Sequence, residues 1–140
     1  MAVADQLRPT LLRLSSELRR EKIAGVSQHQ VGLLVAIKYS PGVTVGELAS
    51  GEHVSTAAMS KRISRLERDG LVARTKSEAD RRCVGLTLTE EGQRALRRVR
   101  SRRTAWLASR LGALTPGELA AVGAAAEPLA RLLEREEGRA

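Results

Sequence analysis

Hydrophobic residues recur along this chain at helical spacing. In residues 4–22 four leucines follow one another at intervals of four, three and four, which places them on one helical face. They are Leu7, Leu11, Leu14 and Leu18. Pro9 lies early in this segment, where a first turn could tolerate it or a short break could precede the helix. A lone helix of this length is marginal in water, so the stripe is expected to pack on another element.

Three capping boxes, each a Ser or Thr followed three residues later by Glu or Gln, predict where further helices begin. The pairs are Ser27 with Gln30, Thr44 with Glu47, and Thr115 with Glu118. The helix that follows Ser27 is expected to end near Tyr39. Because it is apolar on more than one face, it is expected to be central.

A short helix after Thr44, a turn and a longer helix after Ser55 come next. The longer helix carries a narrow apolar stripe at Met59, Ile63 and Leu66. Gly70 is placed to end it in the left-handed conformation. The spacing therefore predicts a helix-turn-helix pair.

Two short strands are predicted after this pair, at residues 71–74 and 83–88, and the second alternates strictly between apolar and small or polar positions. The segment between them, residues 75–82, is almost entirely polar and would project as a wing. A long helix from Thr89 to about Ala113 and a last helix after Pro116 complete the pattern.

The predicted fold is therefore mainly α with a small β-hairpin wing. It is a winged helix-turn-helix with N- and C-terminal dimerisation helices. Residues 44–88 are the predicted winged helix-turn-helix module, of the kind that places one helix in a DNA major groove. Residues 4–39 and 89–137 are the predicted helical scaffold, within a single domain over 1–140.

Composition narrows the possible classes of protein. The chain has no Phe, one Trp and one Tyr, so its core must be built from Leu, Val, Ile and Ala. One cysteine cannot form an intrachain disulfide, and no Cys/His cluster has zinc spacing. No apolar run is long enough for a membrane span, and no secretory signal is visible, so the expected compartment is the cytoplasm.

The positive charge is concentrated in one part of the chain. The net charge is +8, and residues 54–103 contain 14 basic and 6 acidic residues, so the excess in this segment equals that of the whole chain. A localised basic face is typical of a protein that binds a polyanion. An arginine-rich solvated surface would give the same pattern.

The helix after Ser55 has the side chains that reading DNA requires. Thr56, Ser60 and Lys61 can hydrogen-bond base edges, and Ala57 can contact a thymine methyl. Four further residues are better placed for phosphates, namely Arg62, Ser64, Arg65 and Arg68. The alternative is an ordinary amphipathic helix that begins with small residues.

The wing tip carries Asp80, Arg81 and Arg82. An arginine on a projecting loop suits the negative potential of a narrow minor groove, with Asp80 as an orienting partner. Taken alone, the loop fits a solvated charged surface better.

These segments together resemble the MarR family of bacterial transcription regulators. The resemblance rests on ELAS, then VSTAAMSKRISRLERDGLVAR, then SEADRRCVGLTLTEEG. It implies a homodimer whose outer helices interlock, bound to a near-palindromic operator of double-stranded DNA. It also implies a minor-groove contact from Arg82, and base contacts from the start of the longer helix, namely from Ser55, Thr56, Ala57, Ser60 and Lys61.

Many members of this family respond to small aromatic acids, phenols or drugs, and others sense oxidants through cysteine. Cys83 is predicted on the outward face of a strand, where an incidental small residue is the better interpretation. A ligand pocket could involve His29, Tyr39, His53 and Trp106, although each is more easily explained by packing or by exposure to solvent.

The sequence therefore favours a dimeric, sequence-specific DNA-binding regulator that acts as a repressor, and the family resemblance adds relief by a small ligand as an option. The alternative keeps the fold but serves as an architectural or protein-interaction module with little sequence preference. An enzyme is disfavoured because no nucleophile–base pair, paired-carboxylate site or phosphate-binding glycine loop is present. No cofactor, metal or membrane partner is expected.

Overall fold

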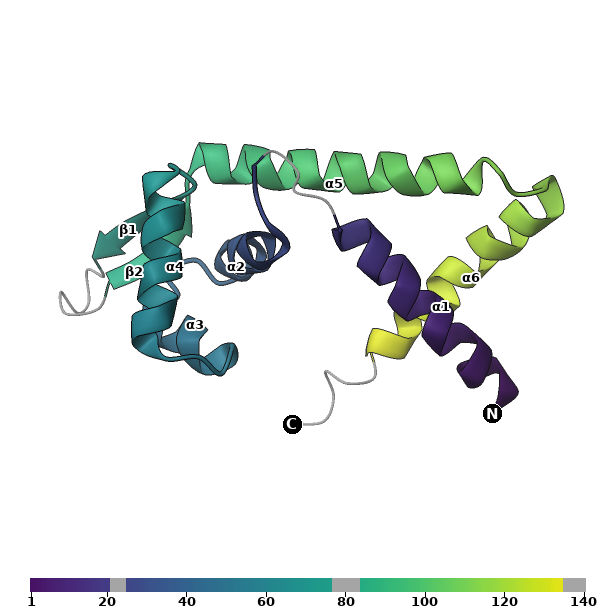
Figure 1. Ribbon diagram of the computed structural model, residues 1–140, viewed down its shortest axis with the longest axis horizontal. Coiled ribbons are helices and arrows are strands. Elements are labelled where there is room, and N and C mark those ends of the chain that lie inside the picture. The colour runs from purple at the N-terminus through teal and green to yellow at the C-terminus, as the bar shows by residue number, and fades with distance from the viewer. Residues whose placement is uncertain (21–24, 77–83, 135–140) are drawn as a thin grey trace. The chain divides into compact units, whose positions relative to one another are not determined.

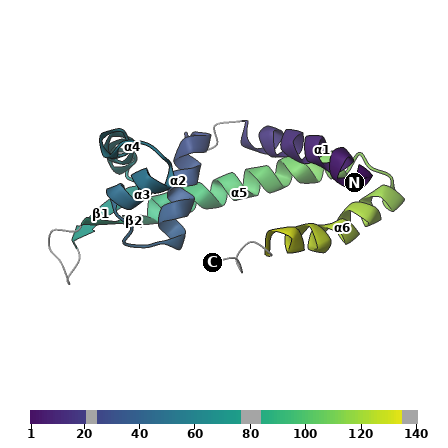
Figure 2. The same cartoon turned by 90° about the horizontal axis from the view of Figure 1, so that it is seen from below.

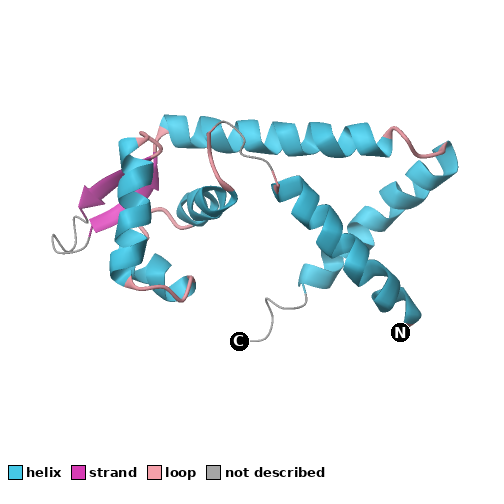
Figure 3. Ribbon diagram, viewed as in Figure 1, coloured by secondary structure: helices cyan, strands magenta, loops and turns pink. Residues whose placement is uncertain are grey.

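The computed structural model describes residues 1–20, 25–76 and 84–134. Within these ranges the chain is mainly helical with one two-stranded antiparallel sheet, which confirms the predicted fold class (Figure 3). The elements, labelled in Figure 1, are α1 (Ala2–Arg19), α2 (Gln28–Tyr39), α3 (Val45–Gly51), α4 (Thr56–Arg68), β1 (Val72–Lys76), β2 (Val84–Leu88), α5 (Glu90–Leu111) and α6 (Pro116–Glu134).

The chain divides into two compact units, residues 1–103 and 104–140, which are described separately below. The single domain over 1–140 stays a prediction. No helix in the described ranges has both the length and the apolar content to cross a membrane.

The core of the first unit lies where α2, α4 and β2 meet. Its fully buried large side chains come from these three elements and are Leu34, Ile37, Met59, Ile63, Leu66 and Leu86. The capping box that begins α2 is complete, because Ser27 N–H donates to the Gln30 side chain at 2.9 Å and Gln30 N–H donates to the Ser27 hydroxyl at 3.4 Å. The expected central position of this helix is confirmed.

The turn between α3 and α4 ends α3 with a reciprocal pair of backbone bonds. Val54 N–H donates to Ala49 C=O at 3.1 Å, and His53 N–H donates to Ser50 C=O at 3.3 Å. This pattern requires a left-handed residue at His53, whose φ is +54°. Gly51, the only glycine nearby, does not take this conformation, because it is the last residue of α3. A histidine therefore occupies a conformation that usually belongs to glycine.

Replacing His53 by glycine is expected to raise the free energy of unfolding by about 0.5–1 kcal/mol, because glycine has no Cβ to strain at positive φ. Urea denaturation followed by circular dichroism measures the change. Glu52→Gly is the matched control: its φ is −92°, so glycine there relieves no strain and should lower stability. Equal effects of the two substitutions would contradict the strained turn.

The wing is joined directly to the end of α4. Gly70 has φ +75°, and its N–H donates to Glu67 C=O while Leu71 N–H donates to Leu66 C=O, both at 3.0 Å. This confirms the predicted left-handed end of the helix. β1 then pairs with β2 in antiparallel register, with Val72 opposite Leu88. β1 contacts α4, beside which the hairpin lies in Figure 1, and β2 contacts α3, which lies beside the hairpin in Figure 2.

A third segment extends this small sheet, which the sequence pattern did not predict. Val43 forms an antiparallel bridge with Leu86 on the free edge of β2. Gly42 N–H donates to Leu86 C=O at 2.9 Å, and Leu86 N–H donates to Val43 C=O at 2.8 Å. The loop after α2 is thereby tied to the wing.

The outer helices keep apolar residues exposed. α1 has no buried residue, and Leu11 and Leu14 are 43% and 40% exposed. α6 likewise has no buried residue, and Leu132 and Leu133 are 64% and 75% exposed. Within the leucine stripe of α1, Leu11 and Leu14 therefore stay exposed, while Leu7 and Leu18 are half-buried.

The placement of Pro9 differs from the prediction. The helix begins at Ala2, so Pro9 lies inside α1 and not in its first turn or at a break. Proline lacks an N–H, which leaves the Asp5 carbonyl without its helical donor. Asp5 is exposed, so water can take the place of that donor.

Candidate nucleic-acid interface

The N-terminal half of α4 presents small and polar side chains to solvent. Ser55 is the N-cap and its hydroxyl accepts the Ala58 N–H at 3.1 Å. Ser55, Thr56, Ala57 and Lys61 are exposed, and Ser60 is half-buried. The structure therefore brings the five predicted base-contacting residues together at one end of the helix.

The opposite face of α4 is buried in the core and anchors the helix. Met59, Ile63 and Leu66 are fully buried in the core, as the spacing predicted. Ala57 and Lys61 are four residues apart, so they share the outward face. Arg68, also exposed, continues that face toward the end of the helix.

One flank of α4 faces the start of α2. Arg62 and Arg65 line a hollow of about 260 Å³ together with residues near the α2 N-terminus. The other lining residues are Gly25, Ser27, His29, Gln30, Leu33 and Asp69. Two of the four residues predicted to contact phosphates thus lie beside α2, and His29, a weak candidate for a ligand pocket, lies beside them.

The other flank of α4 is bound to the wing by Arg74 of β1. Its guanidinium donates to the Ser64 hydroxyl at 3.3 Å and pairs with the Glu67 carboxylate at 3.3 Å. Ser64, predicted to contact phosphate, is therefore already an acceptor for Arg74. This role of Arg74 could not be predicted from the sequence, since a lone arginine in a short strand gives no signal of its partners.

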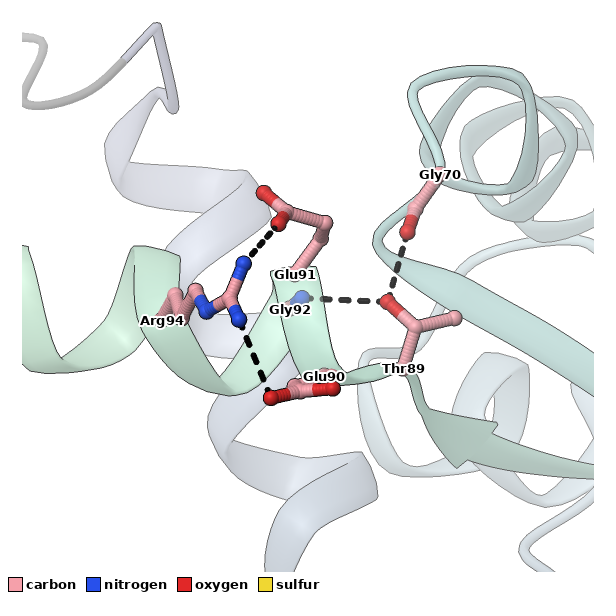
Figure 4. Close-up of polar contacts among 6 residues, drawn as sticks. All are labelled: Gly70, Thr89, Glu90, Glu91, Gly92 and Arg94. Atoms are coloured by element: carbon pink, nitrogen blue, oxygen red, sulfur yellow. Dashed lines mark hydrogen bonds and ion pairs between the residues drawn. The ribbon is translucent and has the colours of Figure 1, made fainter.

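Thr89 joins the end of α4 to the start of α5. Its hydroxyl accepts the Gly92 N–H at 3.0 Å and donates to the Gly70 carbonyl at 2.5 Å (Figure 4). Thr89 N–H also donates to Leu71 C=O at 3.1 Å. The sequence predicted that a helix begins at Thr89, but not the bond to Gly70, which fixes α5 to the turn after α4.

The wing-tip residues Asp80, Arg81 and Arg82, and also Cys83, lie outside the described residues, so their predicted roles stay predictions. The strand that leads to the tip ends in Thr75 and Lys76, both exposed.

Within the first unit, the described residues that line the hollow with His29 include neither Tyr39 nor His53. Tyr39 is 77% exposed, and the Lys38 ammonium lies 5.6 Å from its ring centre. Trp106 belongs to the second unit, where Arg110 lies 5.2 Å from its ring. His53 is exposed in the turn before α4.

Comparison with known proteins finds a matching family and related regulators. Residues 26–84 match the model of the MarR family. Over 113 residues, 81% of this chain and 73% of the relative, the sequence is 33% identical to the HTH-type transcriptional repressor MdtR of Bacillus subtilis.

Two solved structures share the fold. The transcriptional regulator Tm0710 of Thermotoga maritima superposes with a TM-score of 0.82 at 24% identity, with 99% of each chain covered. FabT of Streptococcus pneumoniae, solved in complex with DNA, superposes with a TM-score of 0.56 at 24% identity, covering 96% of this chain and 94% of that one.

Proposed function

The chain belongs to the MarR family of DNA-binding transcription regulators, and from this premise we propose that it is a homodimeric repressor that recognises a specific, near-palindromic operator in double-stranded DNA. It is not an enzyme, since the relatives that establish the family are regulators. We place its action in the bacterial cytoplasm, on the DNA of the nucleoid.

The observation that carries the proposal is the division of α4 into a buried stripe and an exposed, capped N-terminal half. Small side chains at Thr56 and Ala57 let the helix approach base edges in a major groove, and Lys61 lies one turn further on. Arg62, Arg65 and Arg68 add charge for the phosphates.

Exposed leucines on the outer helices support the homodimer. Helices α1 and α6 leave side chains such as Leu12 and Leu133 at 66% and 75% exposure, and apolar patches of this kind mark interaction surfaces. A second copy would cover them. Two copies related by a two-fold axis would present two α4 helices to half-sites about 34 Å apart.

A repressor is favoured because the relative MdtR is named as one. The wing would add minor-groove contacts through Arg82, with Arg81 beside it and Asp80 as orienting partner. Relief by a small aromatic acid would use the hollow beside α2, where Arg62 and Arg65 offer two guanidinium groups for a carboxylate.

The test is binding to a DNA fragment from upstream of the chain's own gene, compared with a scrambled fragment, across a salt titration. A preference of about a thousandfold at physiological salt with a steep salt dependence is expected. The same salt dependence without preference would favour the alternative of an architectural winged-helix protein. A monomer by sedimentation at micromolar concentration would contradict the dimer.

Replacing Lys61 by alanine is expected to change base preference as well as to weaken operator binding, by about 1–3 kcal/mol, because Lys61 lies on the outward face of α4 within reach of base edges. Competition between operator variants measures the preference. Equal weakening for every sequence would show that Lys61 contacts phosphate only. Lys76→Ala, an exposed cation at the end of β1, is the control and should leave base preference unchanged.

A further inference from the structure

A row of arginines lies on one face of α5, within the part of the helix that belongs to the first unit. It lines a shallow, open hollow of about 650 Å³, and the lining residues are Arg94, Arg97, Arg98, Ser101 and Arg102. Residues three and four apart are neighbours on a helix surface, so these side chains face a common volume. From Arg94 to Arg102 this α5 arginine row extends about 12 Å along the helix axis.

Among the described residues, most of this charge has no ion-pair partner. Arg94 pairs with Glu90 at 3.0 Å and with Glu91 at 2.6 Å (Figure 4). In the part of the chain that the structure describes, Arg97, Arg98 and Arg102 form no ion pair. Like charges at these spacings destabilise a helix. An anion held between them would remove this repulsion and accept several hydrogen bonds at once.

The row is distant from the DNA-contacting end of α4. Thr89, the residue before α5, is bonded to Gly70 beyond the C-terminal end of α4. α4 has 13 residues, so its first turn lies about 20 Å from this junction. A duplex held at Thr56 and Ala57 therefore has its contacts at the far end of α4, and the α5 arginine row faces a different anion.

We infer that the α5 arginine row is a binding site for a compact anion with two or more linked phosphate groups, such as a nucleoside polyphosphate or a short inorganic polyphosphate. Guanidinium groups bind phosphate oxygens in a bidentate manner, and the Ser101 hydroxyl adds a donor. The hollow falls within the range of about 300–1,000 Å³ that small-molecule sites occupy. Linked phosphates match a row of charges better than a single compact charge.

The experiment is calorimetric titration of the full chain, without DNA, with inorganic tripolyphosphate at physiological salt. Arg98→Gln is expected to weaken binding about tenfold or more, as for the loss of one charge-assisted contact. Arg100→Gln is the matched control: Arg100 is exposed on the same helix but does not line the hollow, and binding should stay within about twofold. Arg102→Gln provides a second variant of the row, with the same expectation as Arg98→Gln.

Three results would overturn the inference. The first is the absence of binding by wild-type protein at millimolar tripolyphosphate. The second is equal weakening by Arg98→Gln and Arg100→Gln, which would indicate a general response to net charge. The third is loss of DNA affinity in Arg98→Gln as large as in Lys61→Ala, which would assign the row to the DNA interface. Because the titration contains no DNA, failure of the proposed operator binding would leave its outcome unaffected.

Discussion

Replacing Gly92 by alanine is expected to lower the free energy of unfolding of the first unit by about 3 kcal/mol. A Cβ built on Gly92 would overlap the carbonyl oxygen of Leu71. That oxygen belongs to the backbone and accepts the Thr89 N–H at 3.1 Å, so it cannot rotate away as a side chain would. The start of α5 would have to move from the turn that follows α4.

Urea denaturation of Gly92→Ala and wild type measures this cost. Gly32→Ala is the matched control, because Gly32 lies in α2 and a Cβ there would meet nothing within 4 Å. Alanine at Gly32 should stabilise the helix, by up to about 1 kcal/mol. Wild-type stability in Gly92→Ala would show that α5 is not held against Leu71. If Gly32→Ala raises stability and Gly92→Ala lowers it, the loss at Gly92 comes from the close approach to Leu71 and not from the helix propensity of alanine.

The features that the sequence predicted are those encoded locally. The caps at Ser27 and Ser55 depend on residues three positions apart, and the stripe of α4 depends on helical spacing within one element. Local preference and burial agree at these positions, so the elements follow from the pattern. The family resemblance added the expectation of a dimer, to which the exposed leucines of α1 and α6 lend support.

The features that the sequence did not predict depend on contacts between distant segments. Val43 bridges Leu86 across more than forty positions of the chain, and a single valine after a turn carries no sign of this. Arg74 orders the wing flank of α4 through Glu67, a pairing that only the fold creates. A third unpredicted feature is local. His53 takes a left-handed conformation although Gly51 stands two positions before it, because the position where α3 ends decides which residue must adopt this conformation.

The candidate site shows the same division. Sequence spacing placed Ala57 and Lys61 on the outward face of α4, and it also grouped Arg62 and Arg65 with the phosphate contacts. The structure places these two arginines on the flank beside α2, where they line a hollow with His29. The tertiary fold decides which element packs against each flank of α4. The four residues predicted together as phosphate contacts therefore have different neighbours in the structure.

Ala57→Glu is expected to weaken operator binding by at least about 100-fold while leaving the protein folded. Ala57 is exposed and lies two residues after the N-cap Ser55. A carboxylate in the first turn of a helix interacts favourably with the helix dipole, by about 0.3–1 kcal/mol. The same carboxylate would face DNA phosphates in a bound complex, and such like-charge contacts cost several kcal/mol. Stability and DNA affinity should therefore change in opposite directions.

Fluorescence anisotropy with operator DNA and urea denaturation of the same samples test both parts. Gln93→Glu is the matched control, because it changes net charge equally at an exposed position on α5, beyond the junction that ends α4. Its effect on affinity should stay within a few-fold, as expected for long-range screening. If both variants bind DNA equally well, the N-terminal half of α4 does not enter the groove. If both lose affinity equally, net charge accounts for binding, and the division of α4 into a buried stripe and a DNA-contacting half would have no bearing on recognition.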